Sequence, residues 1–310
     1  MTGSEARRQF LKSALGAAAL TTPIGKAFAA GAAAPLAARQ LTGSITVFSG
    51  AGANVVAHRD ADGVALVDGG LEEHSQDLLR LVARQSGSGK VHTLFNTHWH
   101  PRQTGSNLRL GTAGAQIIAH ENTRLWLTQA NPVPPDGHSY GPLPPKARPT
   151  KTFYYGSEQL TLGDEPVEYG YLGQAHTDGD MYVYFRKSNV LVAGGPVAAP
   201  SAGWPLIDIK SNGWIIGLAG AIQKLAGLAN DQTVVVPANG PVLTRADLLA
   251  QHQMYSDIAG RLQRFLRQSL GPGEVVARAP AAAYEAQWGD SKYFVSTAFQ
   301  SLWGHMAPDA

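Results

Sequence analysis

Two histidines separated by one residue, His98 and His100, come directly after the apolar run of residues 91–96. Such a run is typical of a buried strand, and side chains two positions apart on a strand share one face, about 6–7 Å from each other. Imidazole nitrogens placed in this way can bind one metal ion. The sequence therefore predicts a metal site at the point where a strand ends and a loop begins.

Short apolar runs alternate with helical patterns along most of the chain. Periodicity, turn residues and a helix-start signal at Thr244 with Asp247 define two blocks of elements. Such blocks are typical of an α/β protein in which two packed sheets carry helices on their outer faces. The expected strands are 45–48, 54–57, 64–67, 91–96, 115–119, 181–185, 190–193 and 234–236, with others near 152, 160 and 168; the expected helices are 71–84, 121–129, 214–228 and one beginning near 245.

Residues 131–149 break this rhythm, because seven of the nineteen residues are proline. That density excludes a helix or a central strand and predicts a long surface loop. Long loops in compact domains often cover a binding site. We expect this loop to form a lid over the metal pocket with His138 or Tyr140 facing inward. A surface excursion folded away from the metal, such as an oligomer contact, is the alternative.

The first 29 residues are expected to be a targeting signal. Residues 4–12 resemble a twin-arginine export signal, and the mildly apolar stretch 14–25 is too short and too rich in Ala, Gly and Thr to span a bilayer. Cleavage is expected after Ala29 or after Ala34. The chain thus divides into a signal (1–29), a linker (30–43) and one domain with C-terminal helices (44–310). We expect export by the twin-arginine machinery to the periplasm or the medium, with no stable membrane anchor.

Charge and composition exclude several classes of function. The chain has no cysteine, so disulfides, thiolate ligands and a cysteine nucleophile are excluded. Residues 1–29 carry four basic and one acidic side chain, so removing them takes the formal charge from +2 to −1. The remaining domain gives no reason to expect a nucleic-acid partner. A small-molecule substrate is the expected partner.

Polar motifs follow successive strands in an order that resembles the metallo-β-lactamase-fold hydrolases. This resemblance covers residues from about 44 to at least 245 and implies a four-layer αββα sandwich with the metal site at the sheet edges. The motifs that carry it are Asp68-Gly69-Gly70, His98-Trp99-His100, the segment from Gly173 to Asp180 that contains His176-Thr177, Ala193-Gly194-Gly195, and the segment from Val236 to Gly240.

The resemblance implies which residues bind metal. The first metal site of the family corresponds to His98, His100 and His176, all of which are present. The positions that would hold a second metal carry Arg102, Gln103, Gly195 and Asn239, none of which is a metal ligand of the expected type. We therefore expect one zinc ion per chain, with bound water whose pKa can fall to about 7. Iron is less favoured, because iron-dependent oxygenases of this superfamily use an acidic ligand at the position of Gly195.

Arg102 and Asp180 are the predicted catalytic residues. The guanidinium of Arg102 repels a second cation and could hold a substrate carboxylate or stabilise an oxyanion, unless it points into solvent. The resemblance implies that an Asp at the position of Arg102 would orient the attacking water. Asp180 and Asp178 are the nearest candidates to replace this missing base, although capping of the turn at Gly179 is an alternative role for both. Asp68 could be a metal ligand, but the resemblance implies a structural acid beneath the site. The sequence thus predicts a zinc-dependent hydrolase of an ester, lactone or amide; the alternative is a non-catalytic binding or scaffold protein.

Overall fold

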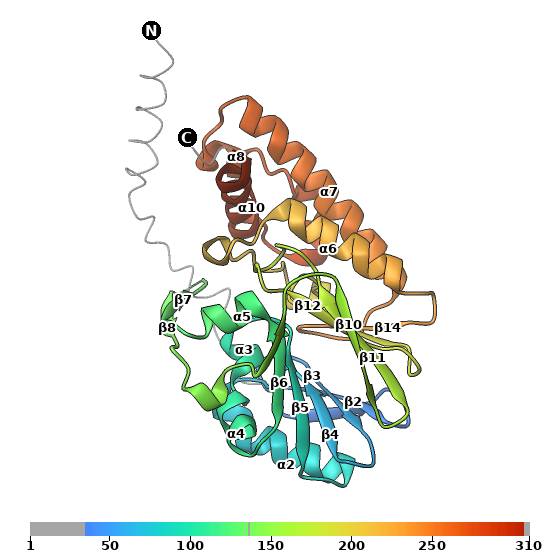
Figure 1. The fold of residues 1–310 in the computed structure, drawn as a ribbon. Helices are drawn as coiled ribbons and strands as arrows, with labels where there is room; N and C mark the ends of the chain where they lie inside the picture. Colours follow the sequence, from blue (N-terminus) through green and yellow to red (C-terminus); the bar gives the residue numbers. More distant parts are fainter. Residues whose placement is uncertain (1–34, 136, 307–310) are drawn as a thin grey trace.

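A computed structural model of the protein describes residues 35–135 and 137–306 (Figure 1). The predicted twin-arginine signal and the cleavage positions lie outside the described residues. The described part contains two large sheets with helices on their outer faces.

The first sheet has seven strands in the order β1-β2-β3-β4-β5-β6-β9. Hairpins join β2, β3 and β4, so this half is antiparallel, and β4, β5, β6 and β9 run parallel. A helix separates β4 from β5, as a parallel crossover requires. The strands are β1 (Ala37–Gln40), β2 (Ile45–Ser49), β3 (Val55–Arg59), β4 (Val64–Val67), β5 (Val91–Asn96), β6 (Gln116–His120) and β9 (Lys151–Phe153).

The second sheet has five strands in the order β10-β11-β12-β13-β14. It is antiparallel except for the β13–β14 pair, which is parallel and connected through a long helix. Every residue of β12 and β13 is buried, as expected for strands covered on both faces. The strands are β10 (Ser157–Leu162), β11 (Glu165–Tyr171), β12 (Met181–Phe185), β13 (Val190–Gly194) and β14 (Val234–Pro237).

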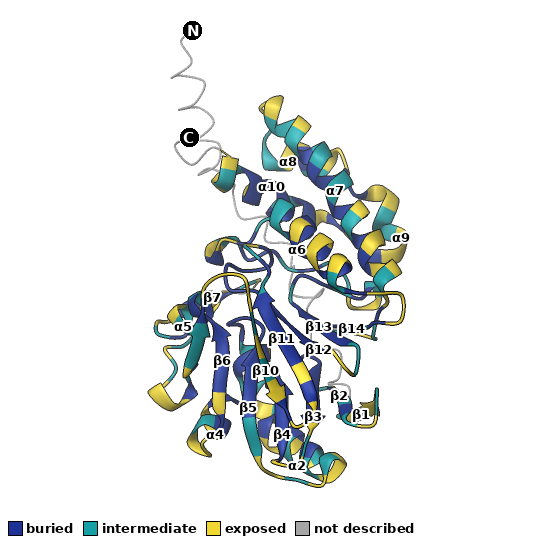
Figure 2. Ribbon diagram, turned by 45° about the vertical axis from the view of Figure 1, so that its right-hand side comes forward, coloured by how far each residue is buried: buried dark blue, intermediate teal, exposed yellow. Residues whose placement is uncertain are grey.

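The two sheets pack face to face around an apolar core that includes Phe95 of the first sheet and Phe185 of the second. Helices α2, α4 and α5 lie outside the first sheet, and α6, α7 and α10 lie outside the second (Figures 1 and 2). The four-layer αββα arrangement is thereby confirmed. The helices are α2 (Ser75–Ser86), α3 (Pro101–Thr104), α4 (Asn107–Thr112), α5 (Glu121–Trp126), α6 (Ile215–Leu228), α7 (Arg245–Arg267), α8 (Pro272–Ala277), α9 (Glu285–Trp288) and α10 (Lys292–Met306), and the 3-10 helices are η2 (Glu72–His74), η3 (Pro145–Ala147), η4 (Pro200–Ala202), η5 (Ile209–Ser211) and η6 (Ala282–Tyr284).

The proline-rich segment 131–149 is more regular than its sequence predicts. It contains a separate two-stranded sheet, β7 (Asn131–Val133) paired with β8 (His138–Tyr140), followed by η3. A pair of edge strands tolerates proline, since one side of each strand needs no ladder hydrogen bond. The expectation of a plain loop is therefore wrong in this detail, although the segment joins neither main sheet.

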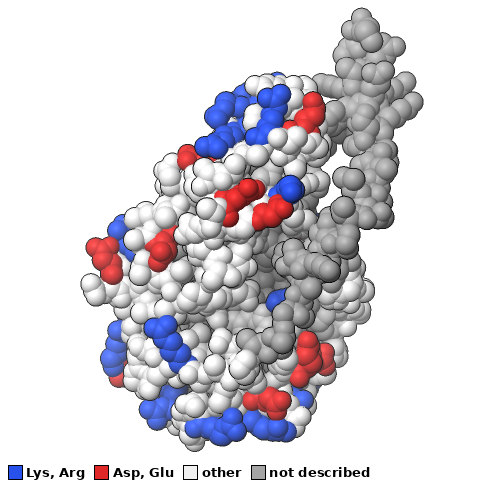
Figure 3. Space-filling view, turned by 180° about the vertical axis from the view of Figure 1, so that it is seen from behind, with Lys and Arg blue, Asp and Glu red and all other residues white. Residues whose placement is uncertain are grey.

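Two further features of the described residues are the length of the helices and the distribution of charge on the surface. Among the described residues, the helices are too short or too polar to cross a membrane. On the face shown in Figure 3, Lys and Arg side chains gather toward the two ends of the molecule, with acidic side chains among them.

Candidate metal centre

The His98-Trp99-His100 segment lies just beyond the end of a strand. Strand β5 ends at Asn96, so the expectation that the strand itself projects both imidazoles is wrong. Pro101 begins α3 and holds His100 in an extended conformation (φ −61°, ψ 153°), which makes a tight turn. The turn brings the ring centroids of His98 and His100 to 4.9 Å.

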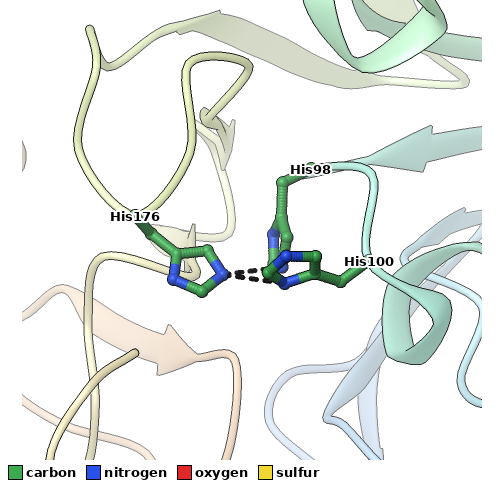
Figure 4. A group of neighbouring side chains, drawn as sticks. All are labelled: His98, His100 and His176. Carbon is green, nitrogen blue, oxygen red and sulfur yellow. Dashed lines mark hydrogen bonds between the residues drawn. The ribbon is translucent and has the colours of Figure 1, made fainter. Parts of the chain in front are cut away.

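The third histidine, His176, comes from the loop between β11 and β12 of the other sheet. Its Nε2 lies 3.2 Å from Nε2 of His98 and 3.1 Å from Nδ1 of His100. All three side chains are buried, and their rings point toward one another (Figure 4). The structure therefore brings together the three residues that the sequence predicts as metal ligands.

The outer nitrogens of two rings have partners that fix their tautomers. Nδ1 of His176 lies 2.7 Å from the carbonyl oxygen of Leu206, which can only accept a hydrogen bond. Nε2 of His100 lies 3.0 Å from Oδ2 of Asp208, also an acceptor. Each outer nitrogen must carry the proton, so Nε2 of His176 and Nδ1 of His100 present lone pairs to each other.

The outer nitrogen of His98 is fixed through a hydroxyl group. Thr97 Oγ1 donates its single proton to Oδ2 of Asp68 (2.8 Å) and lies 3.1 Å from Nδ1 of His98. With Asp68 ionised, the hydroxyl can then only accept from Nδ1, so Nε2 of His98 is a third inward-facing lone pair. Burial raises the pKa of Asp68 to about 8, against the opposing hydrogen bonds from Thr97. Asp68 is thus bonded to Thr97 behind the site, in keeping with the structural role that the family resemblance implies.

Three lone pairs that face one another without a hydrogen-bond donor repel one another, and a bound cation would stabilise them. Nitrogens bound to a tetrahedral zinc ion at 2.0–2.1 Å are about 3.3 Å apart, close to the observed 3.1 and 3.2 Å. Burial, and then the neighbouring imidazoles, lower the pKa of His98 and of His176, so both rings are neutral as metal ligands must be. The residues present fit a single metal ion.

Asp208 is a functional residue that the sequence analysis missed. It lies in the loop between β13 and α6, is completely buried, and accepts hydrogen bonds from His100 and from Ser211 Oγ (2.5 Å). Burial raises its pKa, but the hydrogen bonds from His100 and from the Ser211 hydroxyl act against burial, and the pKa is lowered overall. Asp followed three residues later by Ser in a Gly/Pro-rich loop was the available signal, because that spacing is typical of a capped turn.

Asp180, predicted as a catalytic base, lies behind the histidines. Its buried carboxylate accepts hydrogen bonds from the backbone N–H groups of His176 (2.6 Å) and Thr177 (2.8 Å). Burial raises its pKa to about 8. Asp178 accepts from Trp126 Nε1 at 2.7 Å. Both acids hold the His176 loop in place and neither lines the cavity in front of the rings, so proton transfer by Asp180 stays a prediction that this geometry does not favour.

A cavity of about 720 Å³ opens in front of the three rings. Arg102 lines it and donates one hydrogen bond from Nη1 to the carbonyl oxygen of Gly52 (3.0 Å), so this side chain faces the cavity rather than bulk solvent alone. His138 of the predicted lid also lines the cavity, whereas Tyr140 bonds to Thr104 beneath it. The apolar lining comes from Leu71, Val133, Pro134, Pro135, Val197, Trp204 and Leu206.

The four positions that would hold a second metal line the same cavity. A Cβ atom added at Gly195 would lie 2.3 Å from Cδ2 of His176, so no larger side chain fits there without moving that ring. Gln103 is buried, and the side-chain amide of Asn239 faces the Gly52 carbonyl at 3.0 Å. With the cation of Arg102 beside them, these residues offer no ligand set for a second ion.

The sequence also matches the Metallo-beta-lactamase superfamily over residues 50–206, just over half of the chain and a segment that contains all three histidines. The chain belongs to this superfamily. A comparison with curated protein sequences finds no match.

Several solved structures share the fold. A metallo-beta-lactamase from Pontibacter korlensis is 18% identical with a TM-score of 0.58 over 72% of this chain and 100% of that one. DIM-1 metallo-beta-lactamase is 16% identical with a TM-score of 0.56, over 72% and 98%. The stereoselective inverting sec-alkylsulfatase Pisa1 from Pseudomonas sp. is 15% identical with a TM-score of 0.67, over 89% of this chain and 51% of that one. At these identities the likeness extends to the fold alone.

Proposed function

We propose that this superfamily member is an exported hydrolase that binds one zinc ion through His98, His100 and His176. The observation that carries the proposal is the set of three inward-facing lone pairs, 3.1 and 3.2 Å apart, at the wall of a large cavity. Zinc bound by three histidines supplies Lewis acidity and a water whose pKa is near 7. Export rests on the sequence of residues 1–29 alone.

The other cavity residues suit an ester, lactone or amide that carries an anionic group. Arg102 uses one of its five N–H donors on Gly52, which leaves others for a carboxylate or for a developing oxyanion. The apolar walls would bind the hydrocarbon part of the substrate and exclude water. Arg102 thereby provides the positive charge that a second metal provides in a dinuclear site.

Metal analysis and a substrate panel test this proposal. After buffer exchange the purified protein should contain about one zinc per chain, and His176→Ala should contain none. The panel comprises aryl esters, lactones, amides, phosphodiesters, β-lactams and, because the alkylsulfatase structure covers 89% of this chain, secondary alkyl sulfates. Activity that disappears in His176→Ala and persists in His74→Ala would support a hydrolase. Two zinc ions per chain, or none, would refute the one-metal site.

A non-catalytic binding protein is the second candidate function. All four second-metal positions lack a ligand, and at Gly195 the protein has no room for one. Such a protein would still bind zinc, yet it would turn over none of the panel with zinc added. Turnover abolished by His176→Ala would exclude this candidate.

A further inference from the structure

The lid strands and the turn that carries two of the metal ligands share one small apolar cluster. Trp99, between His98 and His100, is almost fully buried and packs with Leu127 and with Val133 of β7. Its ring centroid lies 4.6 Å from that of His100 at an interplanar angle of 70°. On the other side it stacks on Trp126 at 5.8 Å and 21°. Trp99, which lies between two of the predicted ligands, therefore also packs against the lid strand β7.

A chain of hydrogen bonds connects the same two parts. The hydroxyl of Tyr140, the last residue of β8, lies 2.8 Å from Thr104 Oγ1, which in turn lies 3.0 Å from the carbonyl oxygen of His100. The carbonyl can only accept, so Thr104 donates to it and Tyr140 donates to Thr104. Burial raises the pKa of Tyr140 to about 12, against the Thr104 hydrogen bond, so the phenol keeps the proton that it donates.

We infer that Tyr140 is a positioning residue for His100, and that metal binding and lid docking stabilise each other through Tyr140, Thr104 and Trp99. The inference rests on the proposed metal site. Metal at the three histidines fixes the turn that holds Thr104 and Trp99, and the docked lid restrains the same turn. Linkage is reciprocal, so the factor by which zinc favours the docked lid equals the factor by which the docked lid favours zinc.

Tyr140→Phe in the full chain removes only the hydroxyl group. Zinc affinity is measured by competition with a chromophoric chelator, and lid docking by hydrogen exchange of the peptide that covers residues 131–143, with and without zinc. In the wild type, zinc should slow exchange in that peptide. In Tyr140→Phe, zinc affinity should fall about three- to tenfold, the loss expected for one hydrogen bond, and zinc should protect the lid less by the same factor.

Two further variants separate coupling from general damage. Tyr155→Phe removes a hydroxyl from a tyrosine that is 85% exposed and should change neither measurement. Thr104→Val should reproduce the effect of Tyr140→Phe, and the double variant should add nothing to it. Zinc binding that leaves lid exchange unchanged in the wild type, or unchanged zinc affinity in Tyr140→Phe, would overturn the coupling and leave the metal site standing. A chain that binds no zinc would overturn both.

Discussion

The two halves of the candidate centre differ in how completely the protein supports them. At the three-histidine site each ring has an outer partner, and those partners come from both sheets of the sandwich. At the neighbouring position the side chains bond to the protein itself: Arg102 and Asn239 both meet the carbonyl oxygen of Gly52. One half places three imidazole nitrogens around one point, whereas the other offers the cation of Arg102 and amide side chains in place of metal ligands.

The difference shows that the second position lacks metal ligands and that, at Gly195, packing leaves no room for a larger side chain. Here His176 uses the space that a side chain at position 195 would need. The first site and the absence of the second therefore depend on the same residue.

The largest expected effect compares one residue from each half. His100→Ala removes a lone pair that no neighbour can replace, so zinc content should fall from about one per chain to near zero. Gln103→Ala changes a buried residue at the second-metal position and should keep about one zinc, even if it lowers stability. Inductively coupled plasma mass spectrometry of buffer-exchanged protein measures both. Loss of zinc from Gln103→Ala, or retention in His100→Ala, would break the comparison.

The next effect tests an outer partner of the intact half. Asp208→Ala leaves Nε2 of His100 without its acceptor, and zinc should bind about 10- to 100-fold more weakly. Asp208→Asn can still accept that proton through its amide oxygen and should recover part of the loss. Asp77→Asn changes an exposed acid of α2 that pairs with Arg80 and contacts none of the three histidines, and serves as the control. Equal affinities in all three would show that Asp208 does not orient His100.

The sequence predicted those parts of the centre that depend on local pattern. Apolar runs located the strands, and the His98/His100 spacing located two ligands at a strand end. The outer partners could not be predicted in this way, because Asp208 is separated from His100 by 108 residues and only the packed sheets bring them together. The position of Asp180 behind the rings also depends on tertiary structure. For residues 131–149, the number of prolines predicted an irregular loop. In the structure, backbone pairing between Asn131 and Tyr140 forms part of a small two-stranded sheet.

A smaller effect tests whether the ring of His176 leaves no room for a side chain at position 195. Gly195→Ala adds a Cβ atom 2.3 Å from Cδ2 of His176, so the ring must shift away from its two partners. We expect about tenfold weaker zinc binding, at the lower end of the range for a disturbed ligand shell. Gly43→Ala, where an added Cβ meets no atom within 4 Å, is the matched control. Unchanged affinity in Gly195→Ala would show that the ring has room to move.

The smallest effect concerns a buried histidine that is not one of the three candidate metal ligands. His58 of β3 stacks on Phe185 with ring centroids 5.5 Å apart, and burial lowers its pKa even though Glu165, Asp60 and Asp164 act to raise it. The folded pKa therefore lies below the unfolded value of about 6.5. The neutral ring contributes stability above pH 6.5, and this contribution is lost as the pH falls below 6.5 and the unfolded chain binds the proton first.

His58→Phe keeps the stacked ring and removes the titration. Urea unfolding of the metal-free protein at pH 7.5 and pH 5.5 should show a smaller loss of unfolding free energy in the variant than in the wild type. Each unit of pKa difference is worth about 1.4 kcal/mol. The buried ligands His98 and His176 also have lowered pKa values, but they titrate in both proteins, so the difference isolates His58. Equal losses would show that the neutral state of His58 contributes nothing, and would leave the acid sensitivity to the other buried histidines with lowered pKa values, His98, His120 and His176.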